Sequence, residues 1–375
     1  MAVTLWQVCD ATTARLAREV RLADRCDGIG TLMRRRHGGR AGSGGGKAIE
    51  DFWAWWASAG RAAAEAGNRS GGFEGFTGKM TKRVKAMHPD LAWELAPGGR
   101  AEHALVVAAA GTPERRRIAE RWYQHSPAVD EVWEYHPARQ ASPSSLTAVL
   151  ELGGQMLNLA ELRFDLHVDN DRDVIDTVVF HPSFAKMSAQ ARGQVGFLAL
   201  DWALGEDGVS RWIGGFQTSD TRPAAGVPAD GLIETVEALA SRAAEPRWAL
   251  LRGERDGAVV LASLASPAKW VDHPLMDQHI AVTLPFADQT PEGLPGPASL
   301  DQLRELEEEL TDRLSPGAML IAHETTRGVR TLHVYADSDD PTFAGQMRNA
   351  VSGWPGAAVK SSMDPGWRAI RHLME

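Results

Sequence analysis

The chain has 375 residues, enough for two domains of ordinary size, and 43% of its residues are apolar while 24% are charged. These values are typical of a folded soluble protein and exclude a disordered, collagen-like or fibrous chain. Forty basic and 49 acidic side chains give a net charge of −9, so the overall field repels nucleic acid and anionic membranes, and we expect neither as a partner. Two cysteines, Cys9 and Cys26, exclude a disulfide scaffold and a zinc site built on cysteines alone.

The sequence contains no segment typical of membrane insertion or export. Charged or glycine residues interrupt every apolar stretch before it reaches the length that a bilayer requires. The run Arg34-Arg35-Arg36 is followed by His37-Gly38-Gly39 rather than by an apolar segment, which argues against a twin-arginine signal. We therefore expect a cytoplasmic protein.

Residues 1–47 differ in composition from the rest of the chain. They carry nine basic and four acidic side chains, and residues 37–47 contain six glycines. Such a composition predicts a flexible basic extension that ends in a glycine-rich linker.

Residues 48–220 are expected to form the first α+β domain. Phe52, Trp55 and Trp56 recur at helical spacing in a predicted helix from Asp51 to Ala66, and a second helix is predicted at 78–87. The order strand, strand, helix, strand then follows twice, with predicted strands at 91–95, 104–109 and 131–136, and again at 161–169, 174–181 and 209–216. The repeat predicts two related layers in one mixed-sheet domain.

A proline- and glycine-containing segment and a helix, together 221–245, are predicted to link this domain to a second one at 246–375. The second domain begins with a hairpin turning at Asp256-Gly257. Strand, helix, strand, strand, helix and strand follow, the βαββαβ order of a ferredoxin-like fold. The fold class is therefore α+β, with two mixed-sheet domains, and we expect helices on one face of the second sheet and an available opposite face.

The familiar cofactor and catalytic motifs are incomplete. Gly42 to Lys47 lack two residues that a phosphate-binding loop requires, His323-Glu324 lacks the second histidine of a helical zinc site, and no Gly-x-Ser-x-Gly occurs. No cofactor and no metal is predicted. Asp340-Pro341 and Asp364-Pro365 each place a capping carboxylate before a proline, which indicates helix starts rather than catalytic acids.

One strand carries the candidate catalytic residues. Asp165, His167 and Asp169 share a face of the predicted strand 161–169, and further acids and His181 follow closely in the sequence. Metal binding or acid–base chemistry could use this face. A solvent-facing strand beside an acidic turn has the same sequence, and we favour that interpretation.

The tryptophans offer candidate interaction residues. Thirteen tryptophans accompany only three tyrosines, and most are expected to be buried anchors. Trp354 and Trp367 lie beside prolines and glycines near the C-terminus, and this pair is the best candidate among the tryptophans for exposure to a partner.

The segments Gly328–Tyr335 (GVRTLHVY), Trp354-Pro355 and Asp364-Pro365-Gly366-Trp367 resemble the bacterial family called domain of unknown function 695. The resemblance covers about 247–375. It implies a cofactor-free α+β module with no catalytic residues to carry over, and its βαββαβ order is similar to that of small protein regulators that inhibit ribonuclease E. Upstream, Trp93-Glu94 and Leu204-Gly205-Glu206 look like a segment of uncharacterised bacterial proteins.

These observations lead to one functional prediction with two alternatives. We expect a non-enzymatic module that binds an unidentified protein or peptide through an open sheet face or a tryptophan-bearing groove. The first alternative is a metal-assisted hydrolase that uses Asp165, His167 and Asp169. The second is an inhibitor similar to the ribonuclease regulators. The sequence does not specify the oligomeric state.

Overall fold

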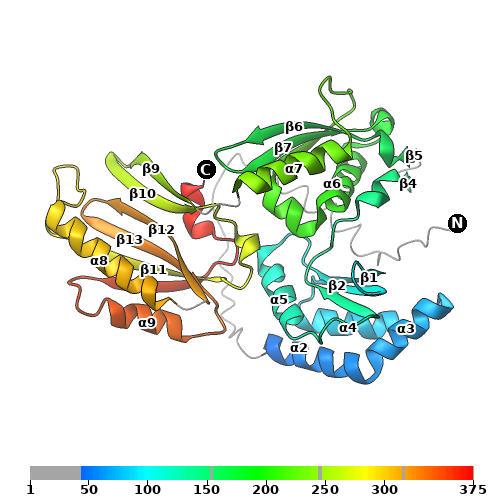
Figure 1. Cartoon of the computed structure of the whole chain (residues 1–375), viewed down its shortest axis with the longest axis horizontal. Helices are drawn as coiled ribbons and strands as arrows, with labels where there is room; N and C mark the ends of the chain where they lie inside the picture. The colour runs from blue at the N-terminus through cyan, green and yellow to red at the C-terminus, as the bar shows by residue number, and fades with distance from the viewer. Residues whose placement is uncertain (1–43, 153–154, 244–246, 315–316, 375) are drawn as a thin grey trace, which may run out of the picture. The chain divides into compact units, whose positions relative to one another are not determined.

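The computed structural model describes residues 44–152, 155–243, 247–314 and 317–374. The predicted flexible extension therefore lies outside the described residues except for its last four positions. Contacts divide the described chain into an N-terminal unit, 44–170 with 174–239, and a C-terminal unit, 240–374 with 171–173 (Figure 1). Each unit combines helices with sheets, so the α+β fold class is confirmed.

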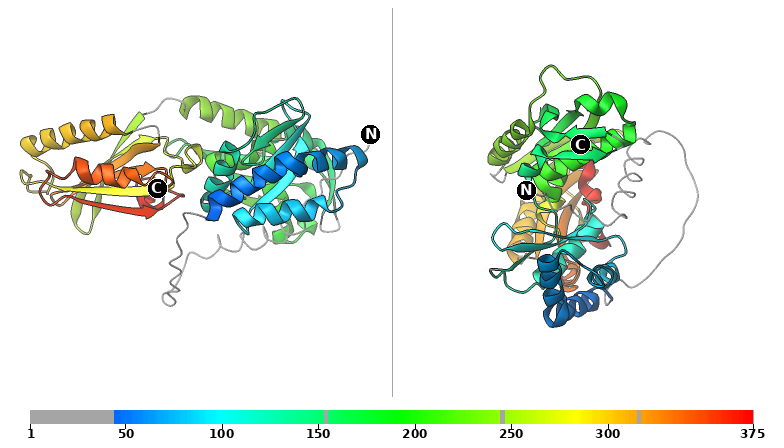
Figure 2. Two further views of the ribbon diagram at one scale, coloured as in Figure 1. Left: turned by 90° about the horizontal axis from the view of Figure 1, so that it is seen from below. Right: turned by 90° about the vertical axis from the view of Figure 1, so that its right-hand side faces the viewer.

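The N-terminal unit begins with helices rather than strands. The helix α2 (Gly44–Trp55) passes through a π-helical turn at Trp56–Gly60 into α3 (Arg61–Ser70), and α4 (Phe76–Met87) packs against α2 (Figure 2). The predicted helix 51–66 is thus part of a longer helical run. A β-carbon at Gly60 would lie 2.9 Å from the Trp55 ring, so this glycine lets the helix keep its close aromatic packing.

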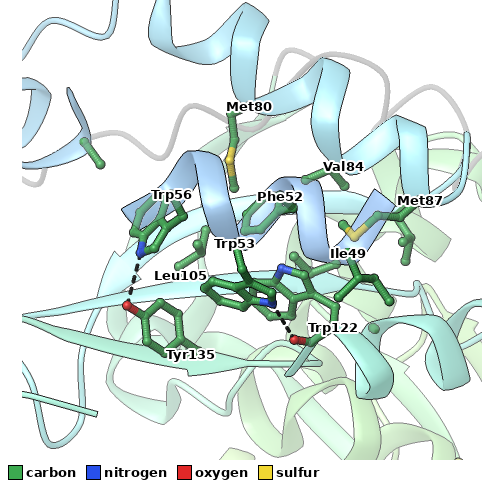
Figure 3. Packing of buried hydrophobic residues seen from close by; sticks show 14 of the residues in the cluster. Ile49, Phe52, Trp53, Trp56, Met80, Val84, Met87, Leu105, Trp122 and Tyr135 are labelled. Atoms are coloured by element: carbon green, nitrogen blue, oxygen red, sulfur yellow. Dashed lines mark hydrogen bonds between the residues drawn. The ribbon is translucent and has the colours of Figure 1, made fainter. Parts of the chain in front are cut away.

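An aromatic core joins these helices to the first sheet (Figure 3). The indole Nε1 of Trp53 donates to the backbone oxygen of Trp122 at 2.8 Å, and that of Trp56 donates to the Tyr135 hydroxyl at 3.1 Å. Phe52 packs edge-on against Trp122, with ring centroids 5.7 Å apart. Trp53 and Trp56 are buried anchors of the kind that the composition predicts, with their indole N–H groups satisfied.

The order strand, strand, helix, strand occurs twice in this unit. It is built first from β1 (Ala92–Pro97), β2 (His103–Ala108), α5 (Pro113–Gln124) and β3 (Trp133–His136), then from β6 (Arg163–Asp169), β7 (Val174–Phe180), α6 (Ala189–Trp212) and β8 (Ile213–Ser219). In both copies the first two strands pair antiparallel and the last two pair parallel.

The two copies form separate three-stranded sheets, each with one antiparallel and one parallel pair, which agrees with the two related layers that the repeat predicts. The hairpin β4 (Val149–Leu152) and β5 (Gln155–Asn158) lies between them in the chain. On β6, the backbone of Phe164 bonds to Val227, so part of its outer edge is occupied by this unit's own chain. After β8, α7 (Ala229–Ala243) buries Leu232 and Leu239.

The C-terminal unit contains one antiparallel sheet of six strands in the order β14-β11-β13-β12-β10-β9. The strands are β9 (Arg247–Arg255), β10 (Ala258–Ser266), β11 (Gln278–Pro285), β12 (Ala318–Thr326), β13 (Val329–Ala336) and β14 (Ala358–Met363). The helices α8 (Pro297–Arg313) and α9 (Thr342–Ala350) pack on one face, where Leu303 and Met347 meet Val282 and Val334 (Figure 1). The predicted βαββαβ order is present, and the finer ferredoxin-like assignment stays a prediction.

The added N-terminal hairpin is confirmed. Asp256 and Gly257 connect β9 to β10 with φ values of 51° and 75°, the two left-handed positions of a type I′ turn. Since β10 pairs with β12, the hairpin extends the sheet and makes β9 its last strand. Along the part of the chain that the structure describes, no helix has the length and apolar character needed to cross a bilayer.

Candidate functional site

The strand face predicted to carry catalysis lies on β6. His167 is exposed, whereas Asp165 and Asp169 are half-buried, and their partners across the antiparallel pair with β7 are Asp176, Val178 and Val174. Nearby, His181 is buried, but its Nε2 contacts the backbone oxygen of Asn158 at 3.0 Å. Within the described residues, no group of three or more His, Cys, Asp or Glu side chains could hold a metal ion. The geometry therefore gives no support to the hydrolase alternative.

Neither Trp354 nor Trp367, the candidate interaction residues, is exposed. Trp367 has only 1% of its surface exposed, and its Nε1 donates to the backbone oxygen of Met276 at 2.9 Å. Trp354 is half-buried and donates to the oxygen of Pro285 at 2.7 Å. Both indoles anchor local structure because their flat faces find apolar neighbours and their N–H groups find backbone acceptors.

The sheet face opposite α8 and α9 is partly covered by the end of the chain, which corrects the expectation of an available face. Trp367 and Ile370, the latter in the 3-10 turn Arg368–Leu373, pack on Leu264 and Tyr335. The Tyr335 hydroxyl donates to Asp364 at 2.7 Å. Asp364 also accepts the backbone N–H groups of Arg368 and Ala369 at 2.9 and 2.8 Å, so it acts as the capping carboxylate that the sequence predicts. Tyr335, Asp364 and Trp367 belong to the segments that resemble the family. They hold the C-terminal segment on the sheet.

Two histidines and a glutamate lie in a row on the same face, an arrangement that the sequence analysis missed. Nε2 of His279 on β11 lies 3.0 Å from Nδ1 of His333 on β13, and Nε2 of His333 lies 3.9 Å from the Glu324 carboxylate on β12. Arg255 and His372 also contact Glu324, at 2.9 and 3.2 Å. The alternating strand pattern places each side chain on this face, but only the strand order brings them together.

Burial makes both histidines of this row less basic. Burial lowers the pKa of His333 to about 4 and also lowers the pKa of His279. Burial opposes the ionisation of Glu324, yet hydrogen bonds from Arg255 and His372 hold the pKa of Glu324 below its usual value. Nε2 of His333 has no hydrogen-bond partner among the described residues, because its 3.9 Å separation from Glu324 exceeds hydrogen-bond distance. With exposures of 5% for His333 and 7% for His279, the row is a buried polar contact rather than an accessible acid–base centre.

A second buried polar cluster joins the two halves of the N-terminal unit. The Arg139 guanidinium contacts Glu94 of β1 and Asp201 of α6, each at 3.1 Å. Glu206 accepts the N–H groups of Ala109 and Gly111 at 3.0 and 2.9 Å. Burial raises the pKa of Glu94, Asp201 and Glu206. The upstream segments Trp93-Glu94 and Leu204-Gly205-Glu206 therefore contribute to an internal link.

A concave surface in the N-terminal unit lies between α2 and α4. The cavity has a volume of about 450 Å³ and is lined by Lys47, Ala48, Asp51, Phe52, Lys82, Arg83 and Ala86. It includes the basic residues Lys82 and Arg83 of α4. Lys47 pairs with Asp51 at 3.5 Å, and Arg83 lies 4.3 Å above the Trp55 ring. Both contacts are ordinary local interactions of surface helices.

The most open feature of the C-terminal unit is the edge strand β9. Leu250 is 85% exposed and Trp248 is 52% exposed, and both project from the same face of β9 because they are two residues apart. On the neighbouring strand, Leu261 lies beside Arg252 and is 36% exposed. β9 carries these exposed apolar side chains together with the charged residues Arg252, Glu254 and Arg255, and charges are one of the ways in which natural sheets protect their edges.

Comparisons with known proteins bear on the C-terminal unit. Residues 247–372 match the model of a family described as a family of unknown function (DUF695). This match confirms the resemblance noted for the C-terminal part of the chain and includes every strand of the six-stranded sheet. Searches of curated proteins and of solved structures both gave no match.

Proposed function

We propose that the chain is a non-enzymatic binding protein whose C-terminal unit takes up an extended polypeptide segment by strand addition along β9. The observation that carries this proposal is the 85% exposure of Leu250 in the middle of a nine-residue edge strand. Strand addition uses main-chain hydrogen bonds for affinity and alternate side chains for specificity. The proposal moves the binding surface from the sheet face to the sheet edge, because the C-terminal segment occupies part of the face.

The turn determines which backbone groups of β9 are free to bind. Arg255 and Ala258 flank the two-residue turn as directly opposed partners, and the residues flanking such a turn share hydrogen bonds. Hydrogen-bonded and non-bonded positions then alternate along the pair. Leu251 therefore directs its N–H and C=O toward β10, whereas Leu250 and Arg252 direct theirs away from the sheet.

The side chains beside this edge indicate the kind of segment that fits. Trp248 and Leu250 offer an apolar surface on the face that also carries Arg252, and Arg252 is exposed. A matching segment is extended, has apolar side chains at alternate positions and carries an acidic residue near Arg252. Such a segment covers the exposed apolar surface and adds main-chain bonds to the outward groups.

Several finer expectations belong with this proposal. We infer a cytoplasmic location and a bacterial origin from the sequence composition and from the family resemblance. The ferredoxin-like order of the C-terminal unit is consistent with an inhibitor of the ribonuclease-regulator type, in which a small sheet domain binds an enzyme. Strand addition is compatible with that alternative, since an inhibited enzyme can supply the extended segment.

The proposal is tested by selecting ligands from a displayed library of random peptides with the full-length protein. We expect enrichment of peptides with alternating apolar residues that bind the wild-type chain. Arg252→Pro removes one outward N–H while leaving the N–H groups that pair with β10, so it should abolish this binding without unfolding the hairpin.

Arg252→Ala is the matched control, because it removes the same side chain but keeps the N–H group. We expect this variant to retain binding within a few-fold of the wild type. Equal binding by Arg252→Pro, with its circular dichroism unchanged, would contradict strand addition. Enrichment of no peptide above library particles that lack an insert would contradict it as well.

A further inference from the structure

The β9 edge is complementary to itself, and we propose that it pairs antiparallel with β9 of a second copy of this chain. This inference rests on the proposed strand addition and names the partner as the chain's own edge strand. The pairing has a two-fold axis at Leu250 and joins two six-stranded sheets into one continuous sheet. Because the axis is perpendicular to the sheet, α8 and α9 of both copies lie on the same face.

The backbone fits this register. The outward-facing residues of β9 are Trp248, Leu250, Arg252 and Glu254, as the hairpin register requires. With the axis at Leu250, each Leu250 faces the same residue of the second copy, and each Trp248 faces Arg252. All three positions use outward N–H and C=O groups, so none of the bonds to β10 is given up.

The side chains fit the same register. The two Leu250 side chains meet at the axis and cover the most exposed apolar residue of the unit. Each Arg252 guanidinium faces an indole, which permits a cation–π contact. On the opposite face, Ala249 meets Leu251 and Arg247 meets Gly253, so no like charges are opposed.

Longer or shifted registers are less favourable. An axis at Leu251 places Arg247 directly opposite Arg255 of the second copy, twice in the dimer. An axis at Arg252 places the two Arg252 side chains against each other. Directly opposed like charges destabilise a strand pair, whereas the Leu250 register contains none over 247–253.

Disulfide trapping in the full-length chain tests this register. In a background with Cys9→Ser and Cys26→Ser, Leu250→Cys places two thiols in a directly opposed, hydrogen-bonded pair about 5.5 Å apart between α-carbons, within the range that a disulfide spans. Arg252→Cys is the matched control, because its two copies lie four residues out of register, about 13 Å apart along the strands. We expect oxidation to convert Leu250→Cys, but not Arg252→Cys, into a covalent dimer.

Sedimentation of the unmodified protein gives the second measurement. We expect the wild type to show twice the mass of one chain at high concentration, and Arg252→Pro to show the mass of a single chain with unchanged circular dichroism. Equal cross-linking of both cysteine variants overturns the register, and a monomeric wild type overturns the dimer. A monomeric wild type that still binds selected peptides through β9 contradicts only this inference, whereas loss of peptide binding as well contradicts the proposed function.

Discussion

His333 shows how a single side chain can couple the stability of the C-terminal unit to pH. Its folded-state pKa of about 4 lies below the unfolded value of about 6.5, because the imidazole is buried. The unfolded chain therefore binds more protons between these values. The stabilisation is fully present above pH 6.5 and is lost as the pH falls through the folded value.

We predict that the free energy of unfolding of the C-terminal unit falls by up to about 3 kcal/mol between pH 6.5 and pH 4 because of this residue. His333→Gln removes the titrating group and should flatten that dependence. Chemical denaturation at a series of pH values measures the slope. His125→Gln is the control, because it changes an exposed histidine in the N-terminal unit and should not alter the pH dependence of the C-terminal unit's unfolding. An equal pH dependence for the wild type and His333→Gln would show that His333 does not cause it.

In the N-terminal unit, Arg139 is the single side chain whose charge we expect to matter most for stability. Its removal leaves the carboxylates of Glu94 and Asp201 buried without their shared cation. We predict that Arg139→Met destabilises this unit by about 3–5 kcal/mol, the usual cost of stranding a buried charge. Arg139→Lys keeps the charge and should lose less. Urea denaturation compares the two variants, and an Arg139→Met protein as stable as wild type would show that the cluster carries no such linkage.

At the level of elements, local sequence predicts single strands and helices better than it predicts which strands become neighbours. The Asp256-Gly257 turn was predictable because the two residues have the conformational freedom that a type I′ turn requires. The bridge between Phe164 and Val227 was not, since these residues lie far apart in the sequence and outside any predicted hairpin. The exposed edge at β9 likewise follows from the pairing of β10 with β12.

The β9–β10 turn gives a prediction at this scale. Gly257 has a φ of 75°, where a β-carbon is sterically unfavourable, so Gly257→Ala should cost about 1–2 kcal/mol of stability. Gly253→Ala is the control within β9, because a β-carbon there meets nothing within 4 Å. Thermal unfolding should show a lower midpoint only for Gly257→Ala. A similar loss in both variants would indicate that the hairpin tolerates no added side chain, irrespective of turn geometry.

At the level of the whole molecule, the sequence predicted the fold class and the character of the C-terminal part, but it did not predict the burial of Trp367. Composition and hydrophobic periodicity are sufficient to predict a fold class, because each helix or strand has its own local sequence pattern. The surface depends on what the C-terminal segment covers, and Trp367 looked exposed only because its neighbours are glycine and proline. The tertiary contacts bury it against Tyr335, with ring centroids 4.8 Å apart.

Backbone hydrogen exchange of β9 tests most directly whether this edge receives a strand. In the full-length chain, at a concentration at which sedimentation shows a single chain, amide exchange would be measured residue by residue with and without a saturating peptide selected from the displayed library. We expect binding to slow exchange at Trp248, Leu250 and Arg252, while Ala249 and Leu251, already bonded to β10, change little. Unchanged exchange at the three outward amides, with protection elsewhere in the chain, would contradict strand addition at β9.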